Sequence, residues 1–416
     1  MTELWNMPRR ARSTAIFTAA MLAALAAGAA LAAEFSMPKT SQEALRIEAE
    51  NALPITQFYD TPKELSASPP GALLRKEAVT QYVLPAGVTA LRILYRSDDA
   101  AGAAVASSAA ILIPAGNKPA GGWPVIVFAH GTSGVARQCA PSAMKDVYYG
   151  QLGLFDFVKA GYAVIAVDYH GLGTKGPHQY MDKVSQANDA IFAVPAARAA
   201  VSSLGEKWVV DGHSQGGLTA WGVAEQEAVL KQPDYLGAVA VAAATHLDGW
   251  LVAHPDTTKN AGFYLAWFAY GIHARFPAFE VTNMLSPAGL AHYREITTQG
   301  CWLNGYTLYL GTDAPAMTKA GWSQDRWVQK FMKEGRAGAA PIEGPLLALA
   351  GEGDTAVPLA AVRDIVDRAC REHLHVTFRS YPGYEHDETM AKTTADQIAW
   401  IKDRFAGTPE SGNCPR

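Results

Sequence analysis

The sequence predicts an α/β fold in which a mostly parallel central sheet is flanked by helices. Two observations support this expectation. Short, continuously apolar runs such as Val125–Ala129 and Ala163–Val167 end at polar turns, and segments with helical spacing separate such runs. A strand that is apolar on both faces must be covered on both faces, which is typical of parallel sheets between two layers of helices.

The expected elements follow one another along the chain. Residues 33–78 form a polar lead. The predicted strands are Leu91–Tyr95, Ala109–Ile113, Val125–Ala129, Ala163–Val167, Trp208–Val210, Ala238–Ala244, Leu346–Ala350 and Val376–Tyr381, and the predicted helices are Gln151–Lys159, Ala190–Ser203, Leu218–Leu230, Ala360–Arg371 and Thr393–Phe405. Ligands of such sheets bind beyond the carboxyl ends of the strands, so we expect the site in the turns that follow them.

The alternation of strands and helices is interrupted between residues 246 and 341. This stretch is rich in large aromatic residues, and a connection of that length needs structure of its own. We interpret it as a helical cap, or lid, inserted between two parts of the core, residues 34–245 and 342–416. Most of its aromatic residues are ordinary helix core, whereas Trp250, Trp267 and Trp302 are candidates for contact with a substrate.

The first 33 residues differ in composition from the rest of the chain. Arg9, Arg10 and Arg12 precede an uncharged, alanine-rich run that ends in the small-x-small pattern Ala30-Leu31-Ala32. This arrangement is typical of a signal peptide that is cleaved near residue 32 or 33. We therefore expect export to the periplasm or beyond, with no stable membrane insertion after cleavage. The alternative is an uncleaved membrane anchor. Alanine is only weakly apolar, so insertion of this run into a membrane would be marginal.

The composition excludes several classes of protein. Of the 416 residues, 49% are hydrophobic, which excludes a disordered chain. The 35 Lys and Arg residues nearly balance the 39 Asp and Glu residues, so a surface for binding nucleic acid is not expected.

The four cysteines form neither a CxxC pair nor a Cys/His cluster, so a zinc site is not expected. In an exported chain four cysteines suggest two disulfides, for which three connectivities exist. We favour the pairs Cys139–Cys301 and Cys370–Cys414, the second of which would tie the tail to the last helices. The alternative is one bridge with two free thiols. We expect neither a metal nor a cofactor.

The segment Gly212-His213-Ser214-Gln215-Gly216 carries the strongest chemical signal. It is a G-x-S-x-G motif between a predicted strand and a predicted helix, which is the context of a nucleophile elbow. Side chains at the two glycine positions would collide with neighbouring backbone in so sharp a turn. Ser214 is therefore the candidate nucleophile, and the alternative is a glycine-rich turn with an incidental serine.

A serine hydroxyl needs an adjacent base to become a good nucleophile. In this topology the acid and the base follow the serine in that order, and Asp354 and His386 each lie in the turn after a predicted strand. We predict that His386 is the base and that Asp354 orients it. Glu352 and Asp168 are the alternatives for the acid, and each is more typical of a structural hydrogen-bond acceptor.

An acyl-transfer site also needs backbone N–H groups that stabilise the oxyanion. Gln215, directly after the candidate nucleophile, supplies one of them at the start of a helix. The second is expected from the loop His130-Gly131-Thr132 that follows the strand Val125–Ala129. We favour the N–H of Thr132, and we interpret His130 as a structural histidine that braces the loop.

The order of these motifs resembles the α/β-hydrolase superfamily over residues 79–406. Within the superfamily, the loop 130–132, the turn 168–173, the segment 212–217 and a large helical cap resemble the secretory lipase family of exported lipases and esterases. The single glycine of the loop 130–132 departs from the HGGG form of other esterases.

The resemblance implies the α/β-hydrolase fold, the triad Ser214, Asp354 and His386, and carboxylic esters as substrates. The expected function is thus an exported serine esterase or lipase that acts on a lipid or aromatic ester through an acyl-enzyme. A serine peptidase or amidase, an acyltransferase, and a non-catalytic binding scaffold of the same fold are the alternatives.

Overall fold

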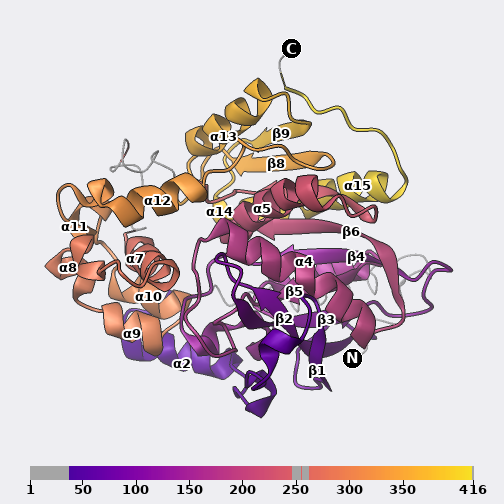
Figure 1. Cartoon of the computed structure of the whole chain (residues 1–416), viewed down its shortest axis with the longest axis horizontal. Helices are drawn as coiled ribbons and strands as arrows, with labels where there is room; N and C mark the ends of the chain where they lie inside the picture. The colour runs from indigo at the N-terminus through magenta and orange to yellow at the C-terminus, as the bar shows by residue number, and fades with distance from the viewer. Residues whose placement is uncertain (1–36, 246–253, 255–261, 415–416) are drawn as a thin grey trace, which may run out of the picture. The chain divides into compact units, whose positions relative to one another are not determined.

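The computed structural model describes residues 37–245, 254 and 262–414 (Figure 1). The predicted signal peptide, residues 1–33, and Trp250 lie outside the described residues. Thr40–Arg416 form a unit of their own, and the fold below is that of this unit.

The central sheet contains nine strands in the order β1-β2-β3-β5-β4-β6-β7-β8-β9. The strands are β1 (Leu73–Ala78), β2 (Thr89–Asp98), β3 (Ala104–Ile113), β4 (Trp123–Ala129), β5 (Ala163–Val167), β6 (Leu204–His213), β7 (Tyr235–Val241), β8 (Leu346–Gly351) and β9 (Val376–Tyr381). All pairs from β5 to β9 are parallel, whereas β1, β2, β3 and β5 pair antiparallel. The predicted mostly parallel sheet is therefore confirmed, with an antiparallel edge.

The polar lead contains two elements that sequence patterning did not identify. The helix α2 (Ser41–Asn51) is capped at its N-terminus by Thr40, whose hydroxyl accepts the N–H of Glu43. The strand β1 lies at the edge of the sheet, and its last three residues are exposed. Edge strands commonly carry charged residues, so β1 lacks the apolar run that marks a buried strand.

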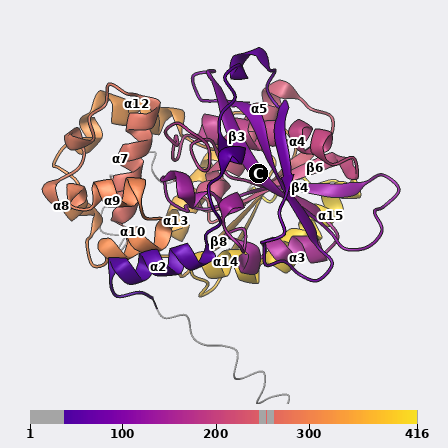
Figure 2. The same cartoon turned by 90° about the horizontal axis from the view of Figure 1, so that it is seen from below.

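Helices cover both faces of the sheet. The helices α4 (Lys183–Ala200), α5 (Gln215–Leu230) and α13 (Leu359–Arg371) pack on one face, and α3 (Leu154–Lys159), α14 (His386–Lys392) and α15 (Thr394–Phe405) pack on the other. In Figure 2, α4 and α5 lie on the opposite side of the strands from α3 and α14. Side chains of a strand alternate between faces, so Val125 and Val127 join the first layer and Ile126 and Phe128 the second.

The parallel register brings the carboxyl ends of the central strands to one edge. Ala129 at the end of β4 lies opposite Val167 of β5 on one side and Gly212 of β6 on the other. Likewise, His213 at the end of β6 lies opposite Val241 of β7. The turns after these strands therefore lie close together, at the edge where the sequence places the site.

Between β7 and β8 the described residues form short helices joined by turns and loops. The α-helices are α7 (Phe263–Arg275), α8 (Pro287–Leu290), α9 (Tyr293–Thr298), α10 (Trp302–Leu308), α11 (Ala314–Met317) and α12 (Arg326–Glu334). They lie together beside the sheet, with α2 along α10 (Figures 1 and 2). A helical cap at residues 246–341 would require helices of this kind. That these residues form a separate unit stays a prediction.

Three contacts attach the start of α10 to its surroundings. A disulfide joins Cys301 to Cys139, which follows the loop after β4. The N–H of Trp302 donates to the carbonyl oxygen of Ser133 at 2.9 Å, and the carboxylate of Glu48 in α2 accepts the N–H of Cys301 at 2.9 Å. The loop after β4, α2 and α10 are thereby held together.

The second disulfide joins Cys370 in α13 to Cys414 near the end of the chain. Both pairs are those favoured from the sequence. The described part of the chain has no helix that combines the length and the apolar character needed to cross a membrane.

Candidate active site

Ser214 occupies the sharp turn between β6 and α5. Its backbone has φ 58° and ψ −117°, a conformation that costs a non-glycine residue about 1–3 kcal/mol. A Cβ on Gly212 would lie 2.1 Å from the carbonyl oxygen of Gly216, and one on Gly216 would lie 1.8 Å from that of Ala129. Neither position accepts a side chain, so the two glycines permit the turn that holds Ser214.

Asp354 and His386 form a hydrogen-bonded pair. Nδ1 of His386 lies 2.7 Å from one carboxylate oxygen of Asp354, and the other oxygen accepts the N–H groups of Ala356 and Val357 at 2.9 and 2.7 Å. Because the carboxylate can only accept, Nδ1 carries the proton and Nε2 is left as a base. Burial lowers the pKa of His386, but the charge and hydrogen bond of Asp354 outweigh it and hold the pKa above its usual value.

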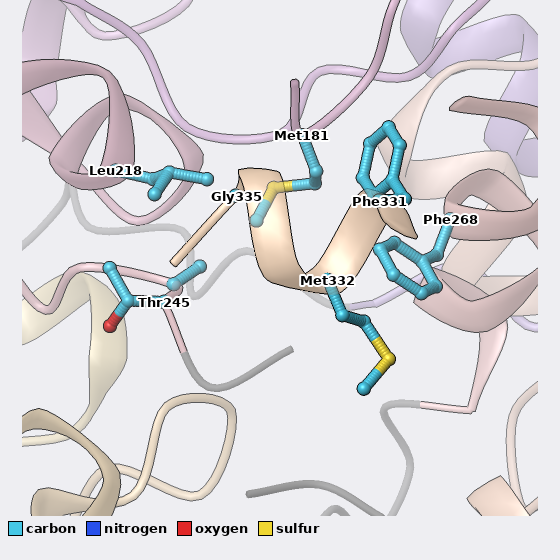
Figure 3. Close-up of a pocket in the computed structure, with 8 residues that line it drawn as sticks. Met181, Leu218, Thr245, Phe268, Phe331, Met332 and Gly335 are labelled. Carbon is cyan, nitrogen blue, oxygen red and sulfur yellow. The ribbon is translucent and has the colours of Figure 1, made fainter. Parts of the chain in front are cut away.

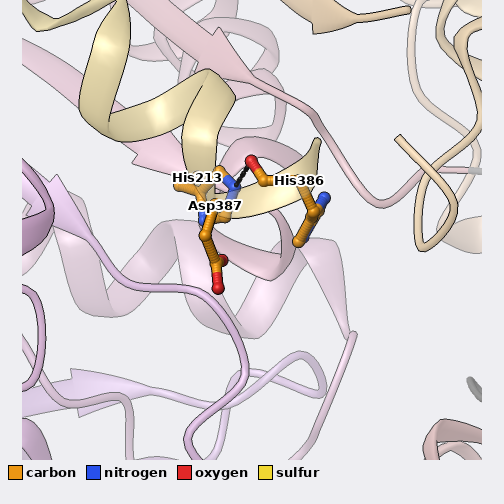
Figure 4. A group of neighbouring side chains, drawn as sticks. All are labelled: His213, His386 and Asp387. Carbon is orange, nitrogen blue, oxygen red and sulfur yellow. Dashed lines mark hydrogen bonds between the residues drawn. The ribbon is translucent and has the colours of Figure 1, made fainter. Parts of the chain in front are cut away.

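The Ser214 turn and the His386 turn meet through His213. Nε2 of His213 lies 3.1 Å from the carbonyl oxygen of His386, and the centroids of the two imidazole rings are 4.5 Å apart (Figure 4). Within the described residues, no hydrogen bond joins Oγ of Ser214 to Nε2 of His386. Catalytic hydrogen bonds are often long before substrate binds. The structure thus pairs His386 with Asp354 and places Ser214 next to the residue that contacts His386.

The loop after β4 packs against the Ser214 turn. A Cβ on Gly131 would lie 3.2 Å from Cβ of Ser214 and 2.2 Å from the hydroxyl of Tyr149, so only glycine fits there. Nε2 of the neighbouring His130 lies 3.1 Å from the carbonyl oxygen of Asp168. Burial lowers the pKa of His130 to about 4, so this histidine is a neutral brace.

Thr132 is held in this loop by two tyrosines. Its Oγ1 lies 2.7 Å from the hydroxyl of Tyr180, and its carbonyl oxygen accepts from the hydroxyl of Tyr148 at 2.6 Å. Across the described residues, the N–H groups of Thr132 and Gln215 have no hydrogen-bond acceptor. Both N–H groups named for the oxyanion hole are therefore without an internal partner there.

The two alternative acids have structural partners. Asp168 is buried and accepts from the hydroxyl of Ser108 at 2.6 Å and from the N–H of Ser142 at 2.7 Å. Burial raises the pKa of Asp168 to about 6, although these hydrogen bonds lower it. Glu352 is exposed and accepts from the hydroxyl of Ser380 at 2.8 Å.

Comparison with protein families identifies the chain. The sequence profile of the secretory lipases matches residues 143–413, well over half of the chain. The chain belongs to the secretory lipase family. The match begins after the loop of Thr132, so that loop is not part of it.

Solved structures similar to this chain show the same fold. Candida antarctica lipase A in its closed state has a TM-score of 0.73 and 18% sequence identity, covering 86% of this chain and 88% of that one. The rice cell wall degrading esterase LipA from Xanthomonas oryzae has a TM-score of 0.67 and 17% identity, covering 82% and 100%. A putative hydrolase from Legionella pneumophila has a TM-score of 0.66 and 18% identity, covering 80% and 98%. Among curated proteins no sequence matches significantly. The predicted α/β-hydrolase fold is confirmed.

A pocket lies beside the Ser214 turn. It is narrow, with a cavity volume of about 10 Å³, and is lined by Met181, Leu218, Ala244, Thr245, Phe268, Phe331, Met332 and Gly335. The N–H groups of two lining residues, Leu218 and Ala244, donate to the carbonyl oxygen of Ser214 at 3.2 and 2.9 Å. In Figure 3 the side chains of Met181, Leu218 and Phe268 surround the turn of helix that carries Phe331 and Met332.

Three neighbouring side chains have the spacing of metal ligands. His213, His386 and Asp387 each offer one ligand atom, and these atoms lie within 4.8 Å of one another (Figure 4). However, both nitrogens of His213 and Nδ1 of His386 already make hydrogen bonds. Only Nε2 of His386 and the exposed carboxylate of Asp387 are left, and these are fewer ligands than a protein zinc site uses.

The two candidate substrate contacts that the structure describes, Trp267 and Trp302, differ in burial. Trp267 is fully buried, and its indole N–H donates to the carbonyl oxygen of Ile296 at 3.1 Å, so it is a core residue. Trp302 is partly buried and donates to the hydroxyl of Tyr264 at 2.8 Å.

Sequence reasoning missed the pocket residues and the contacts of His213, because their partners lie far apart in the chain and no local motif marks them.

Proposed function

We propose that this chain is an exported serine hydrolase that cleaves carboxylic esters. The observation that carries the proposal is the hydrogen-bonded pair of Asp354 and His386, held beside the strained Ser214 turn in a member of the secretory lipase family. Ser214 is the nucleophile, His386 the general base and Asp354 the residue that orients it. Membership of a secretory family and the two disulfides support export.

The proposed reaction has two steps. In the first, Oγ of Ser214 attacks the ester carbonyl carbon while Nε2 of His386 takes the hydroxyl proton, which then passes to the departing alcohol. In the second, water attacks the acyl-enzyme, His386 takes the proton of the water and returns it to Ser214. Asp354 keeps the proton on Nδ1 of His386 and stabilises the imidazolium in both steps.

The N–H groups of Thr132 and Gln215 are proposed to bind the oxyanion that forms in each step. Gln215 is the first residue of α5, where the helix dipole favours negative charge. The side chain and carbonyl group of Thr132 are engaged by Tyr180 and Tyr148, which hold its backbone in place. A preorganised donor of this kind typically contributes about 10²–10³ in kcat.

The proposed substrates carry an apolar acyl group. The pocket beside Ser214 is lined mainly by methionine, leucine, alanine and phenylalanine side chains. Two of its lining residues, Leu218 and Ala244, hydrogen-bond the carbonyl oxygen of Ser214, so the pocket lies next to the turn of the proposed nucleophile. Burial of each methylene in such a pocket contributes about 0.8 kcal/mol.

Hydrolysis of p-nitrophenyl esters of graded acyl length tests this proposal. We expect ester cleavage by the wild type and a fall in kcat of about 10⁶ in Ser214→Ala. Ser203→Ala is the matched control, since Ser203 lies in the turn between α4 and β6, and it should retain full activity. Absence of ester cleavage, or faster cleavage of the matching p-nitroanilides, would contradict the proposal.

A further inference from the structure

We propose that Tyr149 and His213 form a hydrogen-bonded bridge that positions His386 relative to Ser214. His213 directly precedes Ser214, and Tyr149 comes from the segment between β4 and α3. The inference rests on the function proposed above, because it assigns positioning residues to that reaction. Neither residue is proposed to touch the substrate.

The direction of every hydrogen bond in the bridge is fixed. The carbonyl oxygen of His386 can only accept, so Nε2 of His213, at 3.1 Å, carries the proton. Burial lowers the pKa of His213 well below its usual value, so the ring is neutral and Nδ1 must accept. The hydroxyl of Tyr149, 2.6 Å away, therefore donates to Nδ1. Burial also raises the pKa of Tyr149, so its proton stays in place.

The bridge extends to the loop that carries the proposed oxyanion donor. The hydroxyl oxygen of Tyr149 also packs closely against Gly131, where a Cβ would lie 2.2 Å from it. A single tyrosine hydroxyl thereby contacts the loop after β4 and hydrogen-bonds the residue before Ser214. Through His213 the connection continues to the main chain of His386.

Local backbone strain places Tyr149 in this position. Val147 has φ 55° and Tyr148 has φ 63°, two successive non-glycine residues in the left-handed region. This conformation is exceptional for a β-branched residue such as Val147. Strain of this kind persists only where surrounding contacts enforce it, and it occurs often at functional sites. Tyr149 and His213 are both buried, at 4% and 0% exposure.

The bridge supplies a constraint that Asp354 cannot. Asp354 fixes only the Nδ1 end of the His386 ring, which leaves the position of the His386 backbone unspecified. His213 holds that backbone through its carbonyl oxygen and packs its own ring against the His386 ring. The spacing between Ser214 and Nε2 of His386 therefore depends on the residue adjacent to Ser214.

Three variants test the bridge. Tyr149→Phe removes the donor to Nδ1 of His213 and should lower kcat about tenfold. His213→Asn reaches only the position of Nδ1 and loses the contact with His386, so kcat should fall about 10- to 100-fold. His213→Gln places an amide N–H where Nε2 lies, so it keeps the donor to His386 and loses only the contact with Tyr149; kcat should fall no more than in Tyr149→Phe and less than in His213→Asn. KM should change less than twofold in all three.

The second readout is the rate at which a fluorophosphonate labels Ser214, which depends on activation of the serine and not on the substrate. It should follow kcat in all variants. Thermal melts identify any variant that fails to fold. Tyr162→Phe controls for loss of a tyrosine hydroxyl, because Tyr162 packs on Phe405 of α15 and is not part of the bridge.

Each result bears on one proposal or the other. Unchanged labelling in folded Tyr149→Phe and His213→Asn, or equal losses in His213→Asn and His213→Gln, would overturn the bridge. If the wild type is labelled at Ser214 but cleaves no ester, the ester function is wrong, and the labelling rates of the variants still decide the bridge. If Ser214 is not labelled at all, both proposals fall.

Discussion

The orientation of Asp354 makes the variant Asp354→Asn unusually informative. One carboxylate oxygen accepts the N–H groups of Ala356 and Val357, and the other accepts Nδ1–H of His386. An asparagine must keep its oxygen toward the two N–H groups, so its NH₂ group faces His386. That NH₂ group can only donate, which moves the proton of His386 from Nδ1 to Nε2. The imidazole then has no lone pair for the proton of Ser214.

We therefore expect Asp354→Asn to fold normally and to lose about 10⁴ in kcat, the size of effect that a wrong tautomer causes in a serine triad. The assay is steady-state hydrolysis of a p-nitrophenyl ester, with the enzyme quantified by its absorbance at 280 nm. Since Asp354 raises the pKa of His386, the acid limb of any residual activity should move to lower pH. The wild-type enzyme should lose activity as pH falls through that raised pKa.

Glu352→Gln is the matched control for Asp354→Asn. Glu352 lies two residues away, is exposed and accepts from Ser380, so its change should leave kcat within about twofold. Retention of more than a tenth of wild-type activity in Asp354→Asn, or an equal loss in Glu352→Gln, would refute the assignment of Asp354.

Three further changes have defined outcomes. Asp211 is buried, neither of its oxygens has a partner among the described residues, and burial raises its pKa. The folded protein therefore keeps on Asp211 a proton that the unfolded chain loses above about pH 4, so this carboxyl group destabilises the wild type more as the pH rises. In denaturant titrations, the gain in stability from Asp211→Asn should be larger at pH 8 than at pH 5 by about 1 kcal/mol or more. Met332→Trp places a larger side chain in the lining of the pocket beside the Ser214 turn, where it should obstruct a long acyl group but not an acetyl group. We expect kcat/KM for long acyl esters to fall about tenfold while hydrolysis of acetyl esters is retained. Replacing Cys139 and Cys301 by serine opens a link between residues 162 positions apart and should lower the free energy of unfolding by about 3–5 kcal/mol.

The central sheet was predictable because its signals are local. A continuously apolar strand such as β4 or β5 carries its own evidence of burial on two faces, and the glycines of the Ser214 turn record the close approach of neighbouring backbone. The start of α4 was placed several residues late, since its first turns bury Ser185, Gln186 and Asp189. Buried polar residues hide the apolar spacing on which helix prediction depends.

The contacts around the site were less accessible to sequence reasoning. The candidate triad follows from motif order, and its role stays a proposal. The bridge joins Tyr149 to His213 and then to His386, across separations of 64 and 173 residues, with no local pattern that pairs them. His213 was interpreted as structurally ordinary because a histidine inside a turn has many uses. Only the hydrogen-bond directions in the folded chain distinguish it.

The most direct test is a crystal structure of the enzyme after reaction with a fluorophosphonate. We predict phosphorus bonded to Oγ of Ser214, Nε2 of His386 within about 3 Å of that oxygen, and the phosphoryl oxygen held by the N–H groups of Thr132 and Gln215. An adduct on any other residue, or an imidazole of His386 directed away from Ser214 in the adduct, would contradict it.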